Sequence, residues 1–273
     1  MDNYKWRENL DMARTIQKEV LDRIAIIRLN RPSVYNAIDM ELAKELSDIV
    51  LQLSNDKEIW GLVVTGSGEA FCAGGDLKWI SKQGEDYYKT FYAIVGQFHR
   101  AIIEIRNMKK PVVAAINGMA AGGGFSLALA CDFRIIESHA RLILAYTSRG
   151  LTIDGGGTYF LPKIVGIAKA LEIIALDRPI SAQEALSMGL VTQVVQKGDS
   201  VKKAVEFIKG IIKKVPLHSY GICKNLIHES FINPLELQLE KEREAIAYAS
   251  QQPDGKEGIL SFIEKRAPIY KNS

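Results

Sequence analysis

The chain has 273 residues, of which 47% are hydrophobic and 25% charged, and its formal net charge is +3. This composition is typical of a globular protein with a substantial core, and the small net charge gives no reason to expect nucleic acid binding. Cys72, Cys131 and Cys223 are widely spaced without a CxxC pair, so we expect free thiols in the cytoplasm and neither disulfides nor a metal site. No apolar run is long and uninterrupted enough to predict a membrane span.

The first half of the chain predicts short strands that alternate with helices. Residues 15–32 read as two strands with a turn at 21–23, and Asp39 is a plausible N-cap for a helix with apolar residues at helical spacing. Residues 59–66 form an apolar run that is typical of a strand buried on both faces. Residues 85–108 have a helical pattern, residues 109–116 predict a second buried strand, and a further helix begins at the glycines 122–124.

The second half begins with the same alternation and ends with helices only. Residues 141–146 predict a strand, residues 168–176 and 181–189 predict helices, and residues 191–195 predict a last strand. Ser181 and Glu184 stand at the spacing of a capping box. Such alternation favours an α/β fold with parallel strands. We therefore expect a core over residues 1–200, of which 1–13 are an N-terminal extension, and a helical region over 201–273 that packs on the core or on another subunit.

Two glycine-rich segments follow predicted buried strands. They are "EAFCAGGDL" at 69–77 and "NGMAAGGGFSLALACD" at 117–132. Small residues allow a ligand to approach the backbone, and N–H groups at a helix start point outward, so two such groups could form an oxyanion hole. The alternative is that both segments are only tight turns. No Lys-Ser/Thr follows Gly124 and the G-x-G-x-x-G spacing is absent, which excludes phosphate-loop and dinucleotide motifs.

Asp154 is the most unusual acid in the chain. It lies in "GLTIDGGGTYFLP", among glycines and apolar residues and without a neighbouring cation. A carboxyl group in such surroundings is poorly solvated, which raises its pKa and suits it to shuttling protons. The alternative is a structural acid that accepts hydrogen bonds from nearby backbone N–H groups.

Six segments in order resemble the crotonase superfamily, also called the enoyl-CoA hydratase/isomerase family. They include "RPSVYNAI", "EAFCAGGDL", "GLTIDGGGTYFLPKIVG" and "EGILSFIEKRAP", and the resemblance runs from about residue 14 to residue 270. It implies a crotonase-type spiral of strand-strand-helix turns and a C-terminal helical trimerisation region, with homotrimers or dimers of trimers. It also implies an acyl-CoA thioester as substrate, in which coenzyme A is part of the substrate and no separate cofactor or metal is needed.

The resemblance also implies roles for individual residues. The backbone N–H groups of Ala73 and Gly123 would hold the thioester oxygen while an enolate forms, and each such donor typically lowers the barrier by ~3 kcal/mol. The implied CoA contacts are Tyr35, Ala37, Gly75, Phe262 and Lys265. Of these, Phe262 and Lys265 match positions that reach a nucleotide site, often that of a neighbouring subunit.

Departures from the family pattern decide which reaction to expect. The two glutamates that activate water in the hydratases match Ser126 and Tyr146 here, and neither residue is a carboxylate. Asp154 matches the aspartate of ring-1,2-epoxyphenylacetyl-CoA isomerase and related enoyl-CoA isomerases, although Ile153 stands where proline is common. The pattern is most similar to these enzymes, so we expect a 3-enoyl-CoA to 2-enoyl-CoA isomerase with Asp154 as its acid and base.

Three alternatives stay open. The 4-chlorobenzoyl-CoA dehalogenases keep the aspartate as a nucleophile with an upstream histidine as base, and His99 matches that histidine, whereas their tryptophan is Tyr146 here. A hydratase with a non-standard site and a non-catalytic acyl-CoA binder are the others. The acyl group cannot be read from residues 78–100, which follow no recognisable substrate pattern.

Overall fold

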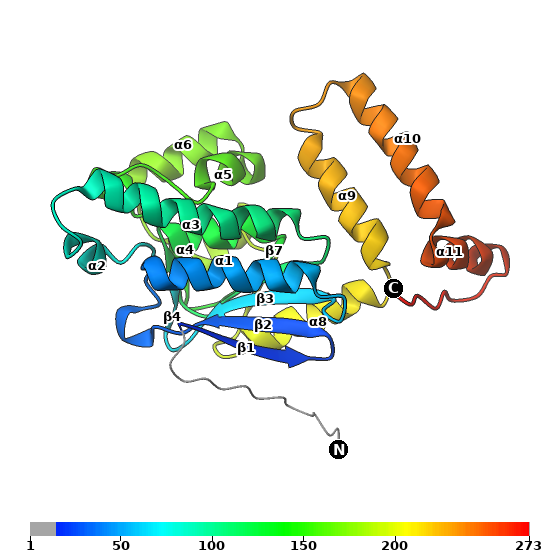
Figure 1. Ribbon diagram of the computed structural model, residues 1–273, viewed down its shortest axis with the longest axis horizontal. Coiled ribbons are helices and arrows are strands. Elements are labelled where there is room, and N and C mark those ends of the chain that lie inside the picture. Colours follow the sequence, from blue (N-terminus) through cyan, green and yellow to red (C-terminus); the bar gives the residue numbers. More distant parts are fainter. Residues whose placement is uncertain (1–14, 273) are drawn as a thin grey trace, which may run out of the picture.

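The computed structural model describes residues 15–272, so the predicted extension at 1–13 lies outside the described residues. Two β-sheets and the helices around them form a body from which a helical arm extends (Figure 1). Within residues 15–272 no helix is both long and apolar enough to cross a bilayer.

The elements follow the alternation that the sequence predicts. The strands are β1 (Ile16–Leu21), β2 (Ile24–Leu29), β3 (Gly61–Gly66), β4 (Ala70–Cys72), β5 (Val112–Ile116), β6 (Met119–Ala121), β7 (Phe133–Glu137), β8 (Arg141–Ile143), β9 (Ile180–Ser181) and β10 (Gln193–Val195). The α-helices are α1 (Met40–Asn55), α2 (Leu77–Ser81), α3 (Tyr87–Asn107), α4 (Gly123–Ala130), α5 (Gly157–Val165), α6 (Ile167–Leu176), α7 (Ala182–Ser187), α8 (Ser200–Ile212), α9 (Leu217–Glu229), α10 (Leu235–Gln251) and α11 (Pro253–Ile263). Two short 3₁₀ turns are η1 (Pro32–Val34) and η2 (Thr147–Arg149).

The strands form one sheet of six and one of four. The larger has the order β1-β2-β3-β5-β7-β10, in which only the β1–β2 pair is antiparallel. The smaller has the order β4-β6-β8-β9, with β4, β6 and β8 parallel. Because β3, β5 and β7 each lead into β4, β6 and β8 within a few residues, the chain winds as repeated strand-strand-helix turns, and the predicted α/β spiral is confirmed.

Glycines allow the sharp corners between the two sheets. A Cβ atom on Gly66 would lie 2.1 Å from the carbonyl oxygen of Ala70, and one on Gly118 would lie 1.9 Å from that of Glu69. No side chain fits at such distances, so each corner needs a residue without one. The corners set where β4 and β6 begin, and so help to place the segments that follow these short strands.

Helices cover both faces of the larger sheet. Helices α1 and α3 pack together over one face with a large apolar cluster that includes Leu46 and Ile105 (Figure 1). On the other face, Ala204, Val205 and Ile208 of α8 pack on β3, β5 and β7. Helix α8 is therefore part of the body, and the helices that extend away from it are α9–α11.

Several local predictions are confirmed at the level of hydrogen bonds. The carboxylate of Asp39 accepts from the N–H of Leu42, and Ser181 and Glu184 form a reciprocal capping box. The predicted strand over residues 141–146 is shorter, since β8 ends at Ile143. The reason is that Ala145 has a φ of 56°, which turns the chain out of the sheet.

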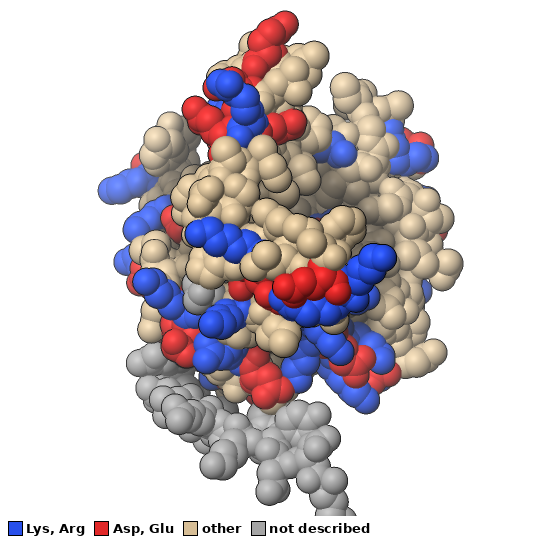
Figure 2. Space-filling view, turned by 90° about the vertical axis from the view of Figure 1, so that its right-hand side faces the viewer, with Lys and Arg blue, Asp and Glu red and all other residues tan. Residues whose placement is uncertain are grey.

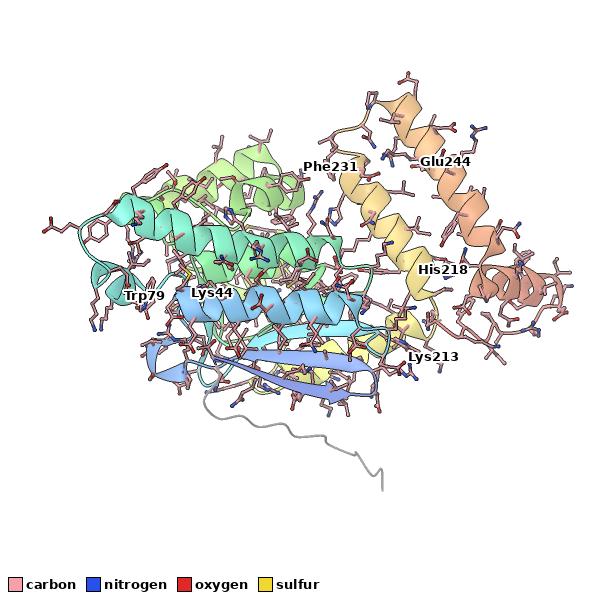
Figure 3. All side chains as sticks on the ribbon, in the orientation of Figure 1. Lys44, Trp79, Lys213, His218, Phe231 and Glu244 are labelled. Carbon is pink, nitrogen blue, oxygen red and sulfur yellow. The ribbon has the colours of Figure 1, made fainter. Side chains whose placement is uncertain are left out.

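The arm is joined to the body by a buried ion pair. Lys224 of α9 lies 2.8 Å from Asp132, whose carboxylate also accepts hydrogen bonds from Tyr220 Oη and from the N–H of Val112 at 2.9 Å each. Just past the other end of α9, the centroid of the Phe231 ring lies 4.5 Å from Nζ of Lys163 in α5, and Figure 3 labels Phe231 there. These contacts place α9 against the body.

The arm leaves much apolar surface uncovered. Figure 2 looks onto the side of the molecule that carries the arm and shows broad uncharged areas between groups of paired charges. The exposed apolar side chains of the arm are Ile227, Phe231, Ile232, Leu235, Leu237, Leu239, Ile246, Tyr248, Ile259, Leu260, Phe262 and Ile263. A surface of this kind is typical of a subunit interface, and the trimer stays a prediction.

Replacing Lys224 tests the joint between arm and body. We expect Lys224→Ala to lower the free energy of unfolding by about 3 kcal/mol, because Asp132 would remain buried without its counter-ion. Lys241 pairs with Glu229 at 3.0 Å on the exposed side of the arm, so Lys241→Ala should cost less than about 1 kcal/mol. Urea denaturation at one fixed protein concentration measures both. Equal midpoints for the two variants would contradict this assignment.

Candidate active site

Asp154 lies between η2 and the start of α5, and hydrogen bonds hold it at two points. Its Oδ1 accepts from Tyr146 Oη at 2.5 Å, and its main-chain oxygen accepts from Ser126 Oγ at 2.8 Å and from the N–H of Gly157 at 3.0 Å. The backbone is thus fixed by one set of donors, while the carboxyl group is held by Tyr146.

The surroundings shift the pKa of both partners. Burial raises the pKa of the Asp154 carboxyl group above its ordinary value, and the hydrogen bond from Tyr146 opposes part of that rise. The pKa of Tyr146 is also raised, first by burial and then by the charge of Asp154, so the phenol stays protonated and acts as a donor. Asp154 is therefore a weakly solvated base with one fixed hydrogen bond.

The predicted donor Gly123 lies directly beside this carboxyl group. Gly123 is the first residue of α4, after Gly122 with a φ of 54°, and its N–H has no acceptor among residues 15–272. A Cβ atom on Gly123 would lie 3.3 Å from Ile38 Cδ1, 3.5 Å from Phe98 Cε1 and 3.8 Å from Asp154 Oδ1. A free amide, a carboxyl group and two apolar side chains thus meet at one point.

The prediction that Ala73 supplies the second oxyanion-hole donor is wrong in this structure. The N–H of Ala73 donates to the carbonyl oxygen of Tyr35 at 3.0 Å and is not available to a ligand. Two residues further on, the N–H of Gly75 has no acceptor in the described part of the chain. The reason is the bridge between Ile38 and Gly75, in which the N–H groups of Ile38 and Asp76 are used and that of Gly75 is left free. Gly75, which the sequence suggested only as a CoA contact, is the better second donor.

Ser126 and His99, which the sequence also suggested as possible catalytic residues, hydrogen-bond to the backbone of residues 154 and 155. Ser126 is fully buried, and its hydroxyl donates to the backbone of Asp154, so it takes no direct part in chemistry in this arrangement. His99 reaches the same segment from α3, where its Nε2 accepts the N–H of Gly155 at 3.0 Å. That nitrogen is already an acceptor, which favours a positioning role over that of a general base.

The predicted CoA contacts fall into two groups. Tyr35 and Ala37 lie beside residues 73–76, since the N–H of Ala73 bonds Tyr35 and the N–H of Ile38 bonds Gly74. Phe262 and Lys265 lie at the end of α11. Helix α2, which contains Trp79 and follows the loop of Gly75, lies at the opposite end of the molecule (Figures 1 and 3). Phe262 is 84% exposed. The structure brings the first group to the site and leaves the second group far from it within one chain.

Arg31 is a residue that the sequence analysis missed. Its guanidinium contacts Asp39 at 2.8 Å and Asp76 at 3.1 Å, and it donates to the carbonyl oxygen of Ala37. Both carboxylates cap helices, Asp39 that of α1 and Asp76 that of α2. Arg31 therefore joins the loop of Tyr35 to the loop of Gly75. Its place directly before Pro32, in a segment that resembles the family, was the available signal.

Two other kinds of chemistry find no support at this site. Among residues 15–272 no three His, Cys, Asp or Glu side chains gather closely enough to hold a metal ion. Cys72 lies next to the site, but burial raises the pKa of its thiol to about 12, so it is not a nucleophile at neutral pH.

Comparison with known proteins identifies the family. The family model described as enoyl-CoA hydratase/isomerase matches residues 19–273. The chain belongs to this family. It is therefore an enzyme of the enoyl-CoA hydratase/isomerase family that acts on acyl-CoA thioesters, as the sequence motifs predict.

Similar proteins within the family differ in chemistry. The chain is 31% identical to a 1,2-epoxyphenylacetyl-CoA isomerase of Escherichia coli, with 95% of this chain and 99% of the relative covered. It is 31% identical to a 4-chlorobenzoyl coenzyme A dehalogenase of Arthrobacter, with 92% and 91% covered. A crystal structure of an enoyl-CoA hydratase from Polaromonas superposes with a TM-score of 0.88 at 34% identity, covering 94% of this chain and 99% of that one. The family is thus established, and these relatives are named for three different reactions.

Alanine substitutions test how tightly the two glycine segments meet. A Cβ atom on Gly124 would lie 2.2 Å from the carbonyl oxygen of Cys72, so Gly124→Ala should destabilise the protein by about 3 kcal/mol. A Cβ atom on Gly75 meets nothing closer than Ile80 Cδ1 at 3.8 Å. Gly75→Ala keeps the N–H group, so it should unfold and turn over substrate like wild type. Thermal unfolding measures the difference, and a Gly124→Ala protein as stable as Gly75→Ala would show that the segments are not in contact.

Proposed function

We propose that the protein is an enoyl-CoA isomerase that moves a double bond from the 3-position to the 2-position of an acyl-CoA. The observation that carries this proposal is the half-buried carboxyl group of Asp154, held by Tyr146, beside the free amide of Gly123. Isomerisation needs one group that removes a proton from one carbon and returns it to another, together with donors for the oxygen that becomes negative.

The proposed reaction has two proton transfers. Ionised Asp154 takes a proton from C2 of the 3-enoyl thioester, and the electron pair of that C–H bond moves into a dienolate whose negative oxygen is bound by the amides of Gly75 and Gly123. Asp154, now protonated, returns the proton to C4, and the double bond forms between C2 and C3. No water or second reactant is consumed.

The groups around Asp154 favour isomerisation over hydration. Adding water to a double bond requires a group that activates the water and another that orients it. Ser126 Oγ already donates to the backbone of Asp154, and the raised pKa of Tyr146 keeps its phenol protonated. Asp154 is then the carboxylate beside the Gly123 amide, and neither Ser126 nor Tyr146 supplies a second one, which supports a shuttle within one substrate.

The side chains beside the two amides suggest the kind of acyl group. Ile38 and Phe98 are both buried and lie within 3.5 Å of the Cβ position of Gly123. We propose an unsubstituted hydrocarbon chain or ring next to the thioester, since a second charged group there would lose its hydration. Phe262 and Lys265 would complete the nucleotide site from a neighbouring subunit of the proposed trimer.

The second candidate is a hydrolytic dehalogenation in which Asp154 is the nucleophile and His99 the base. The similarity to a 4-chlorobenzoyl coenzyme A dehalogenase and the placement of His99 next to Gly155 support it. Against it, Asp154 Oδ1 already accepts a hydrogen bond from Tyr146 Oη, and His99 Nε2 already accepts one from the N–H of Gly155.

An isosteric change at Asp154 tests the lead proposal. Asp154→Asn should lower kcat for a 3-enoyl-CoA by about 10³-fold, because the amide cannot take up the proton. Formation of the conjugated 2-enoyl thioester is followed by ultraviolet absorbance. Asp199→Asn is the matched control, since Asp199 makes no side-chain cap bond to α8. His99→Ala should keep most of the activity. Full isomerisation by Asp154→Asn would refute the isomerase. The second candidate instead predicts that wild type isomerises no enoyl-CoA, releases halide from 4-chlorobenzoyl-CoA, and loses that activity in both Asp154→Asn and His99→Ala.

The pH dependence should report the hydrogen bond from Tyr146. Asp154 must be ionised to remove the first proton, so kcat/KM should fall as pH drops through its raised pKa. Tyr146→Phe removes a donor that favours the ionised form, so the acid limb should move to higher pH. Initial rates between pH 4 and 9 give the limb for both proteins, and a limb that stays in place or moves down would contradict the assignment.

A further inference from the structure

We infer that Asp177, which lies outside the site, is a positioning residue that holds Tyr146 against Asp154. This inference rests on the proposed function, because it concerns the hydrogen bond that orients the proposed base. The family resemblance assigns Asp177 no role. The argument depends on the turn that carries Tyr146, residues 145–148.

Asp177 binds this turn on both sides of Tyr146. Its Oδ1 accepts from the N–H of Ala145 at 2.6 Å, and its Oδ2 accepts from the N–H of Ser148 at 2.9 Å. Thr147 Oγ1 adds a third link by donating to the carbonyl oxygen of Ile174 at 2.8 Å. Both oxygens of one carboxylate are therefore used to fasten the turn to the C-terminal end of α6.

The backbone at both ends of this clamp is unusual. Ala145 has a φ of 56° and Asp177 a φ of 42°, a region that residues with a Cβ atom rarely adopt. Asp177 is the C-cap of α6, where glycine is the usual residue. A carboxylate at such a position needs a compensating interaction, and its two bonds to the turn supply one. The same bonds keep Ala145 in its strained conformation.

Tyr146 depends on this conformation because it directly follows Ala145 and lies between the two clamped amides, those of Ala145 and Ser148. The residue is 7% exposed, with Cζ 3.9 Å from the Cβ position of Gly122, and its Oη donates to Asp154 Oδ1. If Ala145 relaxed to a negative φ, the direction of the following residue would change and the phenol would leave the carboxyl group. Asp177 thus acts on Asp154 through Tyr146.

Glycine at position 177 tests the clamp without adding strain. Asp177→Gly suits the positive φ of the C-cap and removes both hydrogen bonds to the turn. The matched control is Asp22→Gly, since Asp22 also has a positive φ (49°) and its exposed carboxylate pairs with Lys209, at the β1–β2 turn. Both variants lose one aspartate at a left-handed position, and only one of them loses contacts to residues 145–148.

We expect Asp177→Gly to lower kcat for a 3-enoyl-CoA about 10-fold with KM changed less than about 2-fold, because the base loses its orientation and the CoA contacts do not change. The acid limb of kcat/KM should move to higher pH, as for Tyr146→Phe. Amide hydrogen exchange should become faster in residues 145–149. Asp22→Gly should show none of these changes. In a Tyr146→Phe background, Asp177→Gly should have little further effect on kcat.

The inference is overturned if Asp177→Gly matches Asp22→Gly in kcat, in the acid limb and in exchange at residues 145–149. It is also overturned if the effects of Asp177→Gly and Tyr146→Phe on kcat simply multiply. Failure of the proposed function looks different: wild type would not isomerise any enoyl-CoA, while exchange at 145–149 would still respond to Asp177→Gly and not to Asp22→Gly.

Discussion

The site depends on the close approach of two backbone segments, residues 72–75 and 122–124. At Gly124 the backbone comes so near Cys72 that no side chain fits between them. That approach brings Gly74 and Gly75 against Gly123, since a Cβ atom on Gly74 would lie 3.2 Å from the nitrogen of Gly123, and Gly75 is bridged to Ile38. The spiral produces this contact because β4 and β6 are adjacent parallel strands, which end at the same edge of the smaller sheet.

Around these amides, each side chain has a separate task. Asp154 is the group that can gain and lose a proton, Tyr146 is a permanent donor to it, and Ser126 holds its backbone. Burial makes Asp154 more basic, whereas Tyr146 limits that effect. The arrangement provides a carboxyl group with a raised pKa and no second carboxylate, and this is what separates it chemically from a two-glutamate site.

The sequence predicted the fold for identifiable reasons, and it singled out Asp154 and Gly123, which the structure places side by side. Apolar runs, caps and glycine turns are local, so the strand pair at 16–29, the cap at Asp39 and the capping box at Ser181 could be read directly. Asp154 stood out because its neighbours are apolar. Ala73 was wrong because the choice between residues 73 and 75 depends on which amide bonds a segment almost 40 residues earlier. Asp177 was missed for the same reason, since its partners Ala145 and Ser148 are 32 and 29 residues away, and the contact of Arg31 with Asp76 is likewise distant in sequence.

Helix α3 has one further consequence for how this protein could diversify. Its C-terminal half is anchored in the core by Ile102 and Ile105, and its middle supplies Phe98 and His99 to the site. Its first turns instead expose Tyr88 and Tyr92, which stack on each other at the surface. Because these side chains are exposed, substitutions in the first turns can change the surface of the helix while Phe98 and His99 stay in place, so one helix combines a tolerant end with a constrained middle.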